Sequence, residues 1–180
     1  MAVEDPGFPL ARAVVENHAY KIVSVPVGAS GIELEPLNAS NSTIAYVTPT
    51  HQLPLGSVMP VANRLRLIEW AEAGSKYIIE DDYDSELRYS GKPISSLQGL
   101  QRHANVIYLG TFSKVLSPAL RISYMVLPHS LLAAYQQRFR DFAPAVSLLE
   151  QRILARFIEQ GHWERHIRSM RTIYKKKHET

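Results

Sequence analysis

The sequence contains no cysteine, which excludes disulfides, thiolate metal sites and cysteine nucleophiles. It also lacks an apolar run of the ~20 residues that a membrane span needs, and it does not open with a signal peptide. Neither sign of charge is in large excess. The formal net charge is +3, which is too small to argue for binding to nucleic acid or membrane. We therefore expect a cytoplasmic protein that makes no contact with membranes.

The bulk composition is that of a globular domain. Of the 180 residues, 46% are hydrophobic and 21% are charged, as is ordinary for a chain that buries a core. Both ends look cut, because the chain opens on strand-end residues and closes inside a helical pattern. We therefore expect a piece of a longer protein.

Short apolar runs alternate with helical patterns. Runs at 20–27, 43–49, 76–81 and 105–111 predict buried strands, and 9–19 and 59–75 have apolar residues at helical spacing. Gly74 is the expected C-cap of the second helix, and residues 28–42 are rich in turn formers. This alternation predicts a three-layer α/β/α fold with a mostly parallel sheet.

One further run, 121–128, does not fit a parallel arrangement. Only nine residues, 112–120, separate it from the run at 105–111, whereas a parallel crossover needs about a dozen or more. If the two strands are neighbours, they should be antiparallel. From residue 130 onward the pattern is helical, so we divide the chain into a partial large domain at 1–140 and a helical segment at 141–180.

Three strand ends carry polar side chains, after Val47, Ile79 and Leu109. Loops at the carboxyl ends of parallel strands meet at one edge of the sheet, so we expect these three segments to share one pocket. The second is the most acidic, and it raises the question of which cation its carboxylates face. Clustered aspartates also suit magnesium, which stays open as an alternative. The five acids are Glu80, Asp81, Asp82, Asp84 and Glu86.

The third segment contains Lys114, with Thr111 and Ser113 beside it. A lysine in this position can bind phosphate as a point charge, or it can act as an amine nucleophile if its pKa is lowered. Arg121, seven residues further on, could grip a phosphate through two hydrogen bonds. A plain surface lysine is the alternative.

Two motifs together suggest a known family. "EDDYDSELRY" followed by "GTFSKVLSPALRISY" resembles the core of fold-type I pyridoxal-phosphate enzymes, the aspartate aminotransferase superfamily. "VTPTHQLPLG" and "LIEWAE" are more similar to the aminotransferase-like domain of the MocR-type regulators in the GntR superfamily. The resemblance runs over nearly the whole chain. It implies the large domain of fold-type I transferases, incomplete and followed by C-terminal helices.

The resemblance also implies a role for each matching residue. Lys114 would bond covalently to the aldehyde of pyridoxal 5'-phosphate, and Asp81 would pair with the protonated ring nitrogen. Tyr83 would hydrogen-bond the phenolic oxygen of the ring, and His51 and Gln52 would approach the ring or its imine; a loop histidine bonded to backbone is the alternative for His51. Arg121, with Ser113 and Thr111, would hold the phosphate. The remaining acids, Asp82, Asp84 and Glu86, are expected to face solvent or to pair with Arg88.

Several departures from the family leave its function open. Leu53 stands where many aminotransferases have an asparagine that touches the ring. The glycine-rich phosphate segment, the small C-terminal domain and the winged helix of the regulators are not matched, so DNA would be bound only through a domain outside this chain.

Three alternative functions are compatible with this resemblance. The first is a cofactor-binding core of a regulator that senses the cofactor or an amino compound, the second an aminotransferase acting on α-amino acids, and the third an inactive dimerisation remnant. A homodimer is expected. His162 and His166, four residues apart, are expected to face the surface or a partner.

Overall fold

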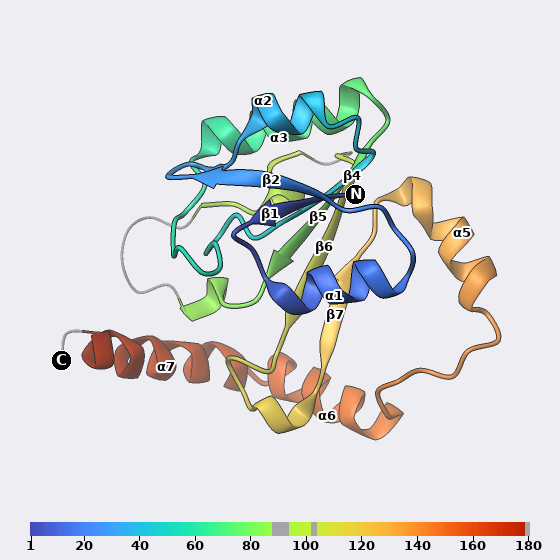
Figure 1. Cartoon of the computed structure of the whole chain (residues 1–180). Helices are drawn as coiled ribbons and strands as arrows, with labels where there is room; N and C mark the ends of the chain where they lie inside the picture. The colour runs from blue at the N-terminus through green and yellow to red at the C-terminus, as the bar shows by residue number, and fades with distance from the viewer. Residues whose placement is uncertain (88–93, 102–103, 179–180) are drawn as a thin grey trace.

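The computed structural model describes residues 1–87, 94–101 and 104–178, and its strands form one sheet in the order β3-β2-β1-β4-β5-β6-β7. Figure 1 shows this sheet at the centre of the molecule. Its strands are β1 (Ala2–Asp5), β2 (Val23–Gly28), β3 (Gly31–Ile32), β4 (Ile44–Val47), β5 (Tyr77–Asp82), β6 (Val106–Thr111) and β7 (Ser123–Val126).

The sheet is mostly parallel, as predicted. Strands β2, β1, β4, β5 and β6 pair in parallel, and β7 runs antiparallel to β6. The antiparallel pairing of β6 and β7 was predicted from the short connection between them. The two-residue strand β3 pairs antiparallel with β2 at the other edge, in a stretch that the sequence analysis assigned only to turns.

Helices cover the two faces of the sheet unequally. The helices α2 (Leu34–Ala39) and α3 (Val61–Ala73) lie on one face, and α1 (Pro9–Asn17) lies on the other (Figure 1). No residue of α1 is buried, whereas α3 buries a row of residues against the sheet and ends at Gly74, the predicted C-cap. The arrangement is the predicted three-layer one, with one face only thinly covered.

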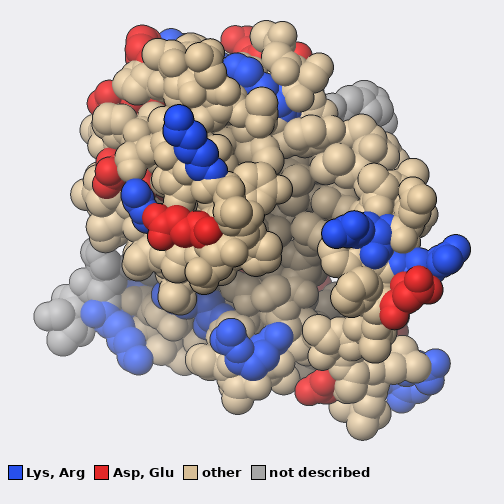
Figure 2. Space-filling model, turned by 45° about the vertical axis from the view of Figure 1, so that its right-hand side comes forward, with Lys and Arg blue, Asp and Glu red and all other residues tan. Residues whose placement is uncertain are grey.

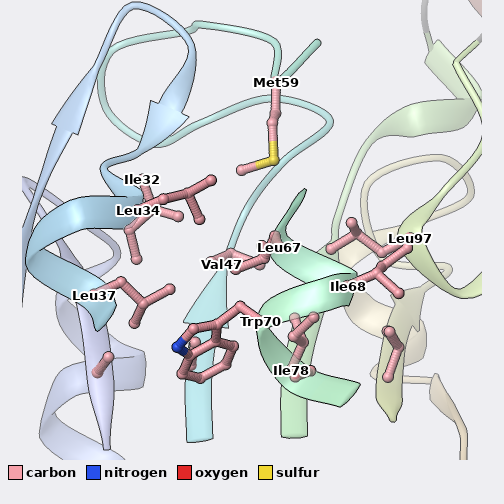
Figure 3. Close-up of a cluster of buried hydrophobic side chains, with 14 of the residues drawn as sticks. Ile32, Leu34, Leu37, Val47, Met59, Leu67, Ile68, Trp70, Ile78 and Leu97 are labelled. Carbon is pink, nitrogen blue, oxygen red and sulfur yellow. The ribbon is translucent and has the colours of Figure 1, made fainter. Parts of the chain in front are cut away.

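The main core lies between the sheet and the helices α2, α3 and α4 (Leu97–Leu100). Figure 3 shows side chains of all three helices meeting those of β4 and β5. The strand residues of this core recur with a period of two, because alternate residues of a strand point to the same face. The core contains, among others, Leu34, Leu37, Val47, Leu67, Ile68, Trp70, Ile78, Leu97 and Val106.

The C-terminal part is helical, as predicted: α5 (His129–Phe139), α6 (Leu148–Glu159) and α7 (His162–His178). Ser147 and Glu150 form a capping box that starts α6. Helix α7 returns to the sheet, where Ile167 packs in a second apolar cluster with Leu87 and Val115. These last two residues belong to the segments that follow β5 and β6, so α7 contacts the edge where the polar loops lie.

The face shown in Figure 2 is hollowed, and residues other than lysine, arginine and the acids make up most of the hollow. Charged side chains of both signs are scattered around it rather than gathered by sign. Among the helices of the described residues, none has the length and apolarity that a membrane crossing requires.

Candidate functional site

The carboxyl ends of β4, β5 and β6 lie side by side, because these strands pair in parallel and in register. A cavity of about 190 Å³ opens at this edge, lined by Phe8, Thr48, Leu53, Asp81 and Tyr83. It therefore joins the loop after β1, the loop after β4 and the end of β5. The third predicted segment comes near this cavity at Lys114, whose Nζ lies 5.8 Å from the centroid of the Tyr83 ring.

Asp81 contributes a carboxylate to this cavity. Its Oδ2 accepts a hydrogen bond from the hydroxyl of Tyr46, which lies on the neighbouring strand β4. Burial raises the pKa of Asp81 above its usual range and the charge of Asp82 adds to this, whereas the Tyr46 hydrogen bond opposes it. A cation placed against Asp81 would offset the cost of keeping this carboxylate charged.

Tyr83 lies in a small polar arrangement with His51 and Asp84. Its hydroxyl donates to the backbone carbonyl of His51 at 2.8 Å, and the two rings stack with centroids 5.9 Å apart. His51 Nδ1 in turn lies 2.8 Å from Asp84 Oδ2. Burial raises the pKa of Tyr83, so the phenol stays protonated and can donate. The single phenolic proton of Tyr83 thus already has an acceptor.

The predicted phosphate-binding residues gather at the junction of β6 and β7. Thr111 Oγ1 accepts from the backbone N–H of Ser113 at 3.2 Å, and Thr111 pairs with Ser123 across the two strands. Arg121 precedes β7 and is exposed, in the left-handed conformation with φ 50°. Together with Lys114, which is also exposed, these residues lie at the same sheet edge as the cavity but outside its lining.

The other acids at the end of β5 and in the segment that follows it do not face solvent, contrary to expectation. Asp82 is buried and accepts hydrogen bonds from the Tyr108 hydroxyl at 2.8 Å and the Ser85 N–H at 3.2 Å. Strand alternation is the reason, because it turns Asp82 to the face opposite Asp81. Glu86 is also partly buried, and it carries a carboxylate oxygen without a hydrogen bond. Arg88, their expected partner, lies outside the described residues.

Glu80 is fully buried on the same face as Asp82. It accepts from the N–H groups of Leu97 and Gln98 at 2.8 and 3.1 Å, and it lies 3.8 Å from Arg64. Burial nevertheless raises its pKa to about 7. The five acids therefore diverge, and in the described part of the chain no three histidine, aspartate or glutamate side chains converge as metal ligands would.

A second buried network holds the loop after β4. Glu4 Oε2 accepts from both the N–H and the hydroxyl of Thr48, at 3.2 and 2.6 Å, and from Gln52 Nε2 at 3.3 Å. The same Gln52 amide bonds the carbonyls of Pro6 and Leu53. Because Thr48 and Leu53 line the cavity, this network fixes one of its walls.

The sequence analysis missed two residues that shape the site, Tyr46 and Glu4. The alternation of β4 offered a signal for the first, because Tyr46 lies two positions before Thr48 and shares its face. Gln52, which was expected near the ring or its imine, is buried and bonds Glu4 and the carbonyl of Pro6. His166 was also misjudged. It is half-buried, and its Nε2 lies 2.8 Å from the carbonyl oxygen of Val115, whereas His162 is exposed as expected.

No family model matches the chain. It is 47% identical over 174 residues to the uncharacterized HTH-type transcriptional regulator YdeL of Bacillus subtilis, covering 97% of this chain and 38% of the relative. It is 39% identical over 172 residues to the probable rhizopine catabolism regulatory protein MocR of Rhizobium meliloti, covering 96% and 35%.

Among solved structures, kynurenine aminotransferase from Pyrococcus horikoshii, crystallised with PMP, superposes with a TM-score of 0.88 at 30% identity. The match covers 97% of this chain and 45% of that one. The chain thus spans less than half the length of the proteins it matches. The mostly parallel sheet, the antiparallel strand β7 and the C-terminal helices agree with this fold, and the chain is therefore part of an aminotransferase domain of fold type I, similar in sequence to that of MocR-type regulators.

Proposed function

We propose that this chain is the pyridoxal 5'-phosphate-binding core of a MocR-type transcriptional regulator. One observation carries the proposal: Asp81 and Tyr83 line a single cavity, and the amine of Lys114 lies 5.8 Å from the Tyr83 ring centroid. An amine, a phenol and a partly buried carboxylate at one sheet edge are the groups that hold such a cofactor. When bound, pyridoxal phosphate supplies an electron sink for charge that develops at the carbon beside an amino group.

The donor set fits the two ends of this cofactor. Asp81 is a desolvated carboxylate with a raised pKa, so a protonated ring nitrogen would stabilise its charged form by a charge-assisted hydrogen bond worth about 1.5–3 kcal/mol. At the junction of β6 and β7, Arg121, Thr111 and Ser113 offer one cation and two hydroxyls to a phosphate.

Tyr83 and His51 would act on the ring from the side of the β4 loop. Tyr83 can donate to the phenolic oxygen of the cofactor only by leaving the carbonyl of His51, which now accepts its proton. His51 is held by Asp84 and stacks on Tyr83, so it is placed to follow any movement of that ring. Lys114 would place its amine at the cofactor aldehyde, where an amine can hold or move a proton.

The regulator is favoured over the enzyme by the two regulators described above, which are 47% and 39% identical to the chain. An aminotransferase acting on α-amino acids is the second candidate, supported by the superposition on kynurenine aminotransferase. In the regulator, the effector would be the cofactor itself or an amino compound that reacts with it. DNA would be bound by a separate HTH domain of the same protein.

We also propose that the protein is a homodimer, in which residues 1–140 form part of the large domain and 141–180 lead towards a small one. Large apolar side chains of α5 and α6 are exposed, which supports a covered surface in the assembled protein. They include Leu132, Tyr135, Phe139, Leu148, Leu149 and Ile153.

The test is to add pyridoxal phosphate, reduce with borohydride and locate the modified peptide by mass spectrometry. We expect the label on Lys114, and its loss in Lys114→Ala. Lys21→Ala is the matched control, because Lys21 is exposed and lies far along the chain from the site. A label that persists in Lys114→Ala would show that the lysine assignment is wrong. A wild-type protein that takes no label at any cofactor concentration would favour the dimerisation remnant.

Regulator and enzyme are separated by adding amino acids to the loaded protein and following conversion of the cofactor to its amine form. Conversion in repeated turnovers supports the aminotransferase. Binding without turnover, together with a winged-helix domain in the flanking coding sequence, supports the regulator.

A further inference from the structure

Helix α7 contacts residues on both sides of Lys114. His166 Nε2 lies 2.8 Å from the carbonyl oxygen of Val115, the residue that follows the lysine. A carbonyl can only accept, so Nε2 carries the proton and donates it. On the other side, the ring of Trp163 meets the ring of Phe112 edge-on, with centroids 5.4 Å apart.

The side chain of Val115 is fully buried and packs in one apolar cluster with Ile167 of α7 and with Leu87. The segment 112–116 is a single turn closed by the bond from the N–H of Leu116 to the carbonyl of Phe112 at 2.9 Å. One isolated turn has little stability of its own. The conformation of this turn, and with it the position of Lys114, therefore depends on the contacts that the turn makes with α7.

The same helix reaches the loop that follows Tyr83. Arg171 Nε donates to the backbone carbonyl of Glu86 at 2.7 Å. Helix α7 is thus bonded to the segment after Asp81 and Tyr83 and to the segment that carries Lys114. A shift of this helix would move the two segments relative to each other.

We propose that His166 is a positioning residue for Lys114, and that through it α7 couples the C-terminal helices to the cofactor lysine. The effect of this coupling on cofactor binding rests on the proposed function. The contact of His166 with the turn that carries Lys114 does not depend on it. Loss of the His166 donor leaves the Val115 carbonyl without this partner and loosens the turn. Lys114 then samples positions away from the Tyr83 ring.

The test compares His166→Leu, which removes the donor, with His166→Gln, whose side-chain amide can again donate to the carbonyl. His162→Leu is the matched control, because His162 lies one turn away on the same helix and is exposed. The first measurement is amide hydrogen exchange in the absence of cofactor. In His166→Leu we expect peptides covering 112–116 to exchange about 3- to 10-fold faster, as the loss of one hydrogen bond implies. Exchange in α3 and β4 should stay unchanged.

His162→Leu should match the wild type, and His166→Gln should recover most of the protection. If 112–116 exchanges at the wild-type rate in His166→Leu, the inference is overturned. It is also overturned if exchange rises equally in α3 and β4, because His166 would then be a general stability contact.

The second measurement is the rate at which pyridoxal phosphate is trapped on Lys114 by borohydride. We expect a fall of about tenfold in His166→Leu, and the wild-type rate in His162→Leu. A wild-type rate in His166→Leu, despite faster exchange, would show that the turn does not position the lysine. If the wild-type protein itself traps no cofactor, the proposed function fails, and the exchange result alone decides the role of His166.

Discussion

Replacing Tyr46 by phenylalanine removes the hydroxyl that donates to Asp81 and leaves the rest of the ring in place. This donor stabilises the ionised carboxylate, so its loss should raise the pKa of Asp81 further above its ordinary value. A hydrogen bond to a charged group contributes about 1.5–3 kcal/mol. In Tyr46→Phe the ionised form of Asp81 should therefore lose about this much stabilisation relative to the protonated form, and the pKa of Asp81 should rise.

The assay is a titration of the aspartate side-chain carboxyl carbons by NMR, without cofactor. Tyr108→Phe is the matched control, because Tyr108 donates to Asp82 on the opposite face of the same strand. That variant should shift the pKa of Asp81 by less than half as much as Tyr46→Phe does. An Asp81 titration that stays at its wild-type position in Tyr46→Phe would refute the reasoning, since the hydroxyl would then not hold the carboxylate.

The remaining predictions concern stability. Arg64→Met removes the guanidinium beside buried Glu80 and three hydrogen bonds to backbone carbonyls. The free energy of unfolding in urea should therefore fall by about 3–5 kcal/mol, and a fall below about 1 kcal/mol would contradict the prediction. The pKa of Glu80 is about 7 in the folded chain, against an ordinary value of 4.5, so the folded state keeps the Glu80 proton to higher pH than the unfolded state does. The free energy of unfolding should therefore fall by about 3 kcal/mol as pH rises from 4.5 to about 7. Glu80→Gln should flatten that slope, and an unchanged slope would assign it to other groups. Gly7→Ala would place a Cβ 2.3 Å from the backbone oxygen of Glu4 and should cost about 1–3 kcal/mol in thermal unfolding, whereas Gly28→Ala, with its nearest neighbour at 3.5 Å, should cost less.

Most of the fold could be predicted because its strands are short apolar runs with a helical pattern between them. The helix α2 was missed because it has six residues and stands in a stretch rich in asparagine, serine and glycine. Its stability comes from tertiary contact, since Leu34 and Leu37 are buried in the main core. The predicted strand at 20–27 began three residues early, because local apolar character does not reveal where pairing with β1 starts.

The site could be predicted only as far as single strands determine it. Alternation along β5 separates Asp81 from its neighbours, but which residue of β4 lies beside it depends on strand register. Alternation along β4 could therefore place Tyr46 on the face of Thr48, but it could not identify Tyr46 as the donor to Asp81. The contact of His166 with Val115 spans 51 residues and depends on how α7 packs, which no local pattern encodes.

The acidity of β5 follows from the two faces of one strand. Glu80 and Asp82 point to the covered face, where Glu80 has two backbone N–H groups and Arg64, and Asp82 has one N–H group and the Tyr108 hydroxyl. Asp81 points to the other face, where the described contacts give it one donor, Tyr46. Because a buried carboxylate is stabilised by each donor it receives, Asp81 is the acid of this strand that would gain most from a bound cation. An arrangement that satisfies two acids internally and leaves the third facing a cavity is expected of a ligand site, and not of a strand that is acidic for solubility.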